Sequence, residues 1–117
     1  MFIYTTTPGE WKEIQTRKAF HDARFPMEGF IHCSYPDQTL WVLNKHYQKE
    51  KTVILLVIDP GKLASPWTSE DLKNRGEEFP HVYGPINLSA VVASHDISRE
   101  DDGVFHENHI LTRMINA

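Results

Sequence analysis

The feature that most constrains the fold of this sequence is an unbroken apolar run from Val53 to Ile58, which follows Thr52. A strand with one face in water alternates apolar and polar residues, whereas a strand covered on both faces is apolar throughout. Asp59-Pro60-Gly61 then ends the run with residues that favour a turn. The run therefore predicts a central β-strand with other elements packed against both of its faces.

The N-terminal region predicts a strand followed by a helix. Residues 2–7 are mostly β-branched or aromatic, which is typical of a strand. Thr7, followed by Pro8 and Glu10, has the pattern of a helix N-terminus, because threonine caps the helix and glutamate can reach back to the cap. We expect this first helix to run to about Lys18.

A second strand and helix are expected after a loop at residues 20–28. Residues 30–33 are mainly apolar and predict a short strand. Ser34 then predicts the N-cap of a second helix, whose apolar residues recur at helical spacing as far as Tyr47.

The second half of the chain is expected to contain mainly strands and loops. Residues 64–78 are polar and predict a long surface loop, residues 79–85 an irregular segment or short edge strand, and residues 90–93 a strand. Residues 96–103 carry four acidic side chains and predict a solvated turn, while residues 104–114 fit either a short strand or a frayed helix. The fold class predicted is α+β, with two N-terminal helices packed on a small mixed sheet.

Length and charge exclude several classes of protein. The 117 residues predict one domain, 1–117, although no pattern decides the structure of the C-terminal segment 96–117. The formal net charge of −4 argues against nonspecific binding to nucleic acid or to anionic lipid. No apolar run approaches the roughly 18–20 residues that cross a bilayer, and residues 1–7 lack the features of a signal peptide. We therefore expect a cytoplasmic protein that does not enter membranes, while its oligomeric state stays open.

The segment from Gly29 to Ser34 is the first candidate site. On a strand, His32 and Ser34 share one face, and the start of the next helix would offer amide groups to an anion such as phosphate. The alternative is structural: His32 would bond a backbone carbonyl, and Ser34 would only cap the helix. Cys33 points to the opposite face, so we expect it to be buried rather than activated by His32.

The segment from Phe79 to Gly84 is the second candidate site. His81 and Tyr83 share a face if this segment is extended, and the neighbouring prolines restrict the backbone. Glu77 lies close by in the sequence and could act as a base or raise the pKa of a histidine. The alternative is a packed turn with His81 exposed.

A metal site is not predicted. His106 and His109 are three residues apart, whereas the zinc-binding helix motif needs histidines four apart with a glutamate after the first. Neither a phosphate-binding loop nor a dinucleotide-binding glycine motif is present.

Two sequence blocks become specific when they occur together: GFIHCS at 29–34 and GEEFPHVYGPI at 76–86. They are accompanied by Ile3-Tyr4, Asp59-Pro60 and Ala90-Val91-Val92. In these motifs, over about residues 2–94, the chain resembles the bacterial domain-of-unknown-function family 952.

The resemblance implies a fold similar to that of the ADP-ribosyltransferase superfamily, a small split sheet whose cleft holds NAD in active relatives. NAD would be a substrate there, and no resident cofactor is expected. The bond between nicotinamide and ribose breaks with oxocarbenium character, so a carboxylate and a clamped ribose suit the reaction. By position, the resemblance implies catalytic roles for His32, Glu77 and His81 and ligand-binding roles for Thr5, Ser34 and Tyr83.

Two positions depart from the family pattern. Relatives often carry a histidine where this chain has Thr5, and an acidic residue where it has Thr68. A threonine hydroxyl can donate one hydrogen bond but cannot replace the acid–base chemistry of histidine or the charge of a carboxylate. Another side chain, such as His21 or Arg24, could substitute for the missing histidine.

The leading hypothesis is a transferase or hydrolase that acts on NAD or on a related ADP-ribose or ribose-phosphate ligand. The alternative is a nucleotide-binding or protein-interaction module that keeps the pocket without catalysis. A third hypothesis is an accessory role in regulation or in a toxin–antitoxin pair. The clustering of His32, Ser34, His81 and Tyr83 favours the enzyme, whereas Thr5 favours the module. A shared site requires the rings of His32 and His81 to lie in one cleft.

Overall fold

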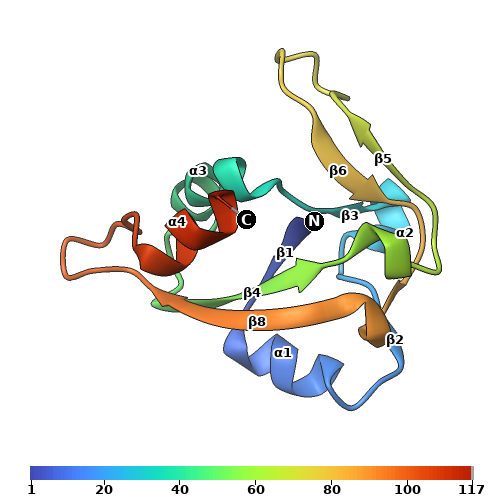
Figure 1. The fold of residues 1–117 in the computed structure, drawn as a ribbon, viewed down its shortest axis with the longest axis horizontal. Coiled ribbons are helices and arrows are strands. Elements are labelled where there is room, and N and C mark those ends of the chain that lie inside the picture. Colours follow the sequence, from blue (N-terminus) through green and yellow to red (C-terminus); the bar gives the residue numbers. More distant parts are fainter. Residues whose placement is uncertain (117) are drawn as a thin grey trace.

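The structure is a computed structural model that describes residues 1–116, so residue 117, the last of the predicted domain, lies outside the described residues. Its elements are shown in Figure 1. The strands are β1 (Phe2–Thr6), β2 (Ala19–Phe20), β3 (Ile31–His32), β4 (Thr52–Ile58), β5 (Trp67–Glu70), β6 (Phe79–Val82), β7 (Ile86–Asn87) and β8 (Val91–Ser98). The helices are α1 (Pro8–Ile14), α2 (Phe25–Glu28), α3 (Pro36–His46) and α4 (His109–Ile115), with 3-10 turns η1 (Pro60–Lys62) and η2 (Leu88–Ala90).

Within residues 1–116 the strands form three sheets, in which every pairing is antiparallel. β4 lies between β1 and β8, β6 lies between β3 and β5, and β2 pairs with β7. The α+β class is confirmed, but the expected mixed sheet is wrong. Parallel neighbours need a crossover that returns the chain to the same end of the sheet, and here each partner strand is reached in the reversed direction.

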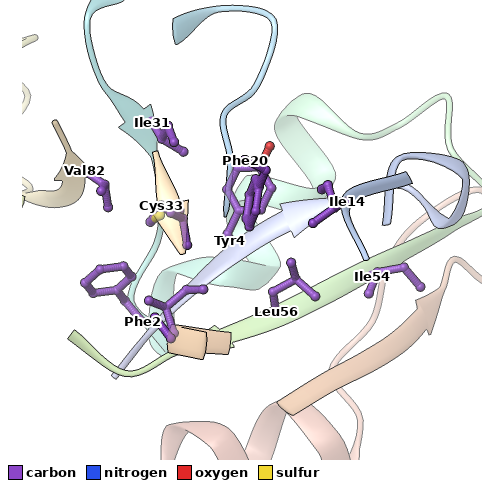
Figure 2. Close-up of a cluster of buried hydrophobic side chains, with 12 residues drawn as sticks. Phe2, Tyr4, Ile14, Phe20, Ile31, Cys33, Ile54, Leu56 and Val82 are labelled. Atoms are coloured by element: carbon purple, nitrogen blue, oxygen red, sulfur yellow. The ribbon is translucent and has the colours of Figure 1, made fainter. Parts of the chain in front are cut away.

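The prediction that residues 52–58 form a central strand is confirmed, because β4 divides the core into two clusters. On one face, Ile54, Leu56 and Ile58 pack with residues of β1, β3, β6 and α1. On the other face, Val53 and Leu55 pack with residues of α3, α4 and β8. Figure 1 accordingly shows α3 and α4 together on one side of this sheet, and Figure 2 shows the first cluster.

The first two predicted helices are shorter than expected. Thr7 caps α1 as predicted, but the helix ends at Ile14 rather than Lys18 because the hydroxyl of Thr16 donates to the carbonyl of Glu13 and the chain turns into β2. Ser34 does not cap α3. Its backbone pairs with Ile3 in an isolated β-bridge, and its hydroxyl bonds Thr39, so the cap position falls one residue later.

The segment predicted as a long loop, 64–78, contains strand β5. The residues of this strand are mostly polar, so the sequence shows no apolar alternation there. Its first residue, Trp67, packs on Phe2 with ring centroids 5.1 Å apart. The next strand, β6, is not an edge strand, because it is paired on both sides. Pro80 is tolerated there because its carbonyl accepts a hydrogen bond from the Cys33 amide, a contact that needs no N–H from proline.

In the C-terminal part, β8 differs from its predicted length, and one of the two alternatives for residues 104–114 is realised. Strand β8 extends to Ser98, so the expected turn at 96–103 begins later. The helix alternative for residues 104–114 is realised as α4, whose N-cap Asn108 accepts hydrogen bonds from the amides of Ile110 and Leu111. Over residues 1–116, none of the helices combines the length and apolarity needed to cross a membrane.

A truncation in β4 tests the two-sided core. Leu56 has 0% of its surface exposed and points into the cluster of Figure 2. We expect Leu56→Ala to lower the free energy of unfolding by about 2–5 kcal/mol, because it removes buried methyl groups and leaves a cavity. Urea denaturation followed by circular dichroism measures this change.

The matched control is Val92→Ala on β8, where the side chain is 41% exposed. Its effect should stay within about 1 kcal/mol. Equal changes in the free energy of unfolding for the two substitutions would contradict the burial of β4 on both faces.

Candidate functional site

A cavity of about 510 Å³ lies where β3, β5 and β6 meet α3. Its lining combines aromatic, titratable and basic side chains. Five of the six residues predicted for the site line it, namely Thr5, His32, Ser34, Glu77 and His81.

The pairing of β3 with β6 places the two histidines side by side. His32 and His81 are direct partners in the register, and their ring centroids lie 5.2 Å apart at an interplanar angle of 77°. Phe30 packs on this pair, with its ring 4.3 Å from that of His81 and nearly parallel to it. Cys33 lies in the core cluster and also borders the cavity, and burial raises the pKa of its thiol, so it is buried as expected. The rings of His32 and His81 lie in one cavity.

His81 is held by a carboxylate that the sequence analysis did not single out. Its Nδ1 lies 2.8 Å from Oε1 of Glu70, which also accepts the hydroxyl of Tyr83. The bonds from Tyr83 and His81 lower the pKa of Glu70, so this carboxylate is ionised at neutral pH and can only accept. We therefore assign the hydrogen of His81 to Nδ1, which leaves Nε2 as a base. The same bond raises the pKa of Tyr83 and keeps its phenol protonated.

His32 is also bonded to a carboxylate. Its Nε2 contacts Oε2 of Glu28, four residues earlier in the chain at the end of α2. This bond lowers the pKa of Glu28. Burial lowers the pKa of His32 and outweighs the opposite effect of the Glu28 bond. His32 is therefore a neutral imidazole at pH 7 that donates from Nε2 and presents Nδ1 as an acceptor.

The other predicted residues occupy three different environments. Glu77 is exposed on the loop between β5 and β6 and lines the cavity from there. Ser34 is 2% exposed and Thr5 8% exposed, so both lie deep in the lining. Tyr83 lies beside the cavity and reaches it through Glu70 and Phe30.

The expected departures from the family pattern have structural counterparts. Thr68 pairs with His81, and Glu70, two residues farther along β5, lies on the same face. A carboxylate is thus present close to the position where Thr68 lacks one. Of the two residues considered as substitutes at Thr5, Arg24 lines the cavity, whereas His21 packs on Phe25 with ring centroids 5.2 Å apart.

Sequence reasoning missed Glu28 and Glu70 because neither stands in a recognisable motif. Glu28 is the last residue of α2 and directly precedes the GFIHCS block. This closeness in the sequence is the signal that could have pointed to its contact with His32.

Among residues 1–116, no three histidine, cysteine, aspartate or glutamate side chains are grouped to hold a metal ion. His106 instead bonds Asp102, with Nε2 2.7 Å from Oδ2.

Comparison with known proteins places this fold and sequence among uncharacterised relatives. Residues 5–94 match the family described as protein of unknown function DUF952. No curated protein gives a significant sequence match.

Solved structures of one protein share the fold. The crystal structure of CC0527 from Caulobacter crescentus matches with a TM-score of 0.83 and 25% identity, covering 95% of this chain and 97% of that chain. A crystal structure of a double mutant of the same protein matches with a TM-score of 0.78 and 24% identity over the same shares. Its solution NMR structure matches with a TM-score of 0.70 and 25% identity, covering 90% of each chain.

The His32–Glu28 contact is tested by Glu28→Gln. The glutamine keeps an acceptor at this position but removes the charge and the strong bond that raise the pKa of His32. We expect the pKa of His32 to fall below its value in the wild-type protein. Titration of the imidazole carbon-bound protons by NMR measures it, and Glu13→Gln on α1 is the control of equal charge change.

The lowered pKa of His32 also determines how this residue makes the stability of the fold depend on pH. Because the folded-state pKa of His32 is lowered, the unfolded chain binds more protons just below its own pKa of about 6.5. The contribution of His32 to stability is therefore complete above that pH and is lost as the pH falls. A His32 pKa that stays the same or rises in Glu28→Gln would refute the assigned contact.

Proposed function

This chain belongs to the DUF952 family, and we propose that the cavity around His32 and His81 binds NAD or a related ADP-ribose nucleotide and breaks a bond at its ribose. The observation that carries the proposal is the pair of adjacent histidines in one cavity, each bonded to its own carboxylate. A volume of about 510 Å³ also suits a ligand of this size. The likeness to the ADP-ribosyltransferase fold stays a prediction from the sequence and agrees with this choice of ligand.

The proposed reaction is cleavage of the bond between the ribose C1′ and nicotinamide. As that bond breaks, its electron pair leaves with nicotinamide, and a water or an acceptor hydroxyl forms the new bond to C1′. His81 Nε2 takes the proton of the attacking oxygen, while Glu70 holds Nδ1–H and stabilises the imidazolium that forms. Tyr83 acts as a positioning residue because it bonds Glu70.

The remaining predicted residues have roles that fit their places. Glu77 is an exposed carboxylate of the lining and would stabilise positive charge that develops on the ribose. His32 presents Nδ1 to a ribose hydroxyl, because Nε2 is engaged by Glu28. Thr5 and Ser34 belong to the deep wall against which the ligand rests.

A second candidate function is a nucleotide-binding module without catalysis. Thr5 favours it, since this side chain is 8% exposed in the lining and cannot carry out the acid–base chemistry of histidine. The two functions share the ligand and differ only in turnover.

Ligand binding is tested by thermal unfolding with NAD, ADP-ribose and ADP-ribose 2′-phosphate. A ligand that binds only the folded state at ~100 times its Kd adds roughly 2.7 kcal/mol, which raises the Tm of a domain of this size by several degrees. We expect a shift in the wild-type protein, none in His32→Ala, and an unchanged shift in His109→Ala, whose side chain is exposed on α4. Absence of any shift at millimolar ligand would remove the nucleotide proposal.

Turnover is tested by chromatographic measurement of nicotinamide released from NAD. Loss of a general base typically costs about 10²- to 10⁴-fold in rate, so we expect a decrease of that size in His81→Ala. His95→Ala is the control, because His95 lies on β8, away from the cavity lining. Binding of NAD without release of nicotinamide by the wild-type protein would establish the non-catalytic module instead.

A further inference from the structure

Three basic side chains line the same cavity without forming ion pairs. Arg24 comes from the segment before α2, and Lys73 and Arg75 come from the loop between β5 and β6. Over residues 1–116, none of the three has a carboxylate oxygen within 4.0 Å of its side-chain nitrogens. Cations that converge on a cavity without ion pairs are suited to an anionic ligand.

The carboxylates of the lining keep their charge, but most of them accept hydrogen bonds within the protein and form no ion pair with these three cations. Glu28 is bonded to His32, and Glu70 to His81 and Tyr83. Asp71 accepts the backbone amides of Arg75 and Gly76 at 3.0 and 2.7 Å, which lowers its pKa. The fourth carboxylate, Glu77, is assigned to the ribose in the function proposed above.

Arg24 and Lys73 are far apart in the sequence but act on the same groups. The bond from His32 lowers the pKa of Glu28 and burial lowers that of His46 at the end of α3, and in both cases the charges of Arg24 and Lys73 lower it further. His46, Arg24 and Lys73 all line the cavity.

Beside this charged part, the cavity has an aromatic surface. Trp41 is 51% exposed in the lining, and its ring lies 6.3 Å from that of His46 and 6.3 Å from that of Phe79. Lys45 Nζ lies 5.5 Å from the centroid of the Trp41 ring. An exposed indole in a cavity that basic side chains also line offers a stacking surface for a flat ring that carries phosphate.

We propose that Arg24 and Lys73, together with Arg75, form a phosphate-binding subsite in this cavity, which holds the diphosphate of a nucleotide whose base stacks on Trp41. The inference rests on the proposed function for the identity of the nucleotide, but not for the presence of the phosphate site. The ligand would contact Trp41, Arg24 and Lys73 as well as His32 and His81, which all line the cavity.

The test compares Arg24→Gln/Lys73→Gln with Lys12→Gln/Arg17→Gln, a control that removes the same charge from exposed residues on and after α1. Calorimetric titrations use ADP-ribose, inorganic pyrophosphate and adenosine, and NMR follows the pKa of His46. We expect the wild-type protein and the control to bind ADP-ribose equally, and the cavity variant to bind it at least tenfold more weakly. Pyrophosphate alone should raise the pKa of His46 in the wild-type protein and not in the cavity variant.

The outcomes separate the two proposals. Unchanged affinity of the cavity variant for ADP-ribose, with binding lost in His32→Ala, would overturn the phosphate subsite and leave the proposed function in place. If the wild-type protein ignores ADP-ribose but pyrophosphate still raises the pKa of His46, the subsite holds and the proposed nucleotide is wrong. Tighter binding of adenosine than of ADP-ribose would also overturn the subsite.

Discussion

Because β4 buries side chains on both faces, other elements have to cover each face. Ile54, Leu56 and Ile58 require β1, β3 and β6 to close over them, while Val53 and Leu55 require α3 and α4. A strand of this kind cannot be left half covered, since each buried aliphatic side chain contributes about 1.5–3 kcal/mol relative to exposure. The cavity forms at the margin of this arrangement, where β3, β5 and β6 meet α3.

The two three-stranded sheets are joined by a single β-bridge between Ile3 and Ser34. This bridge fixes the chain that leaves β3 against the edge of the β4 sheet and explains why Ser34 is buried rather than free to cap α3. The short strand β3 is consequently held in register with β6, and the register brings His32 beside His81. The position of the site is therefore a consequence of how the core is closed.

The chemistry of the site depends on which of its polar side-chain atoms already have hydrogen-bond or ion-pair partners within the protein. Each histidine bonds a carboxylate through one ring nitrogen, so its other ring nitrogen can bond a ligand. The carboxylates of Glu28 and Glu70 are engaged in these bonds. Arg24 and Lys73 have no comparable partner among the described residues. The lining thus combines histidines that can accept protons with cations that can hold negative charge, and the proposed nucleotide ligand rests on this combination.

The sequence by itself determined the α+β class, the central strand at 52–58 and the family, because burial on both faces and two specific blocks are visible in a single chain. It also indicated His32 and His81, since each lies in one of those blocks. Only the tertiary structure decided that β5 is a strand, that β6 is central and that Glu28, Glu70, Arg24 and Lys73 join the histidines. These side chains come from segments without clear periodicity, and the histidines bonded to Glu28 and Glu70 lie four and eleven residues away. Their roles arise from strand register and cavity closure, which no local pattern of residues encodes.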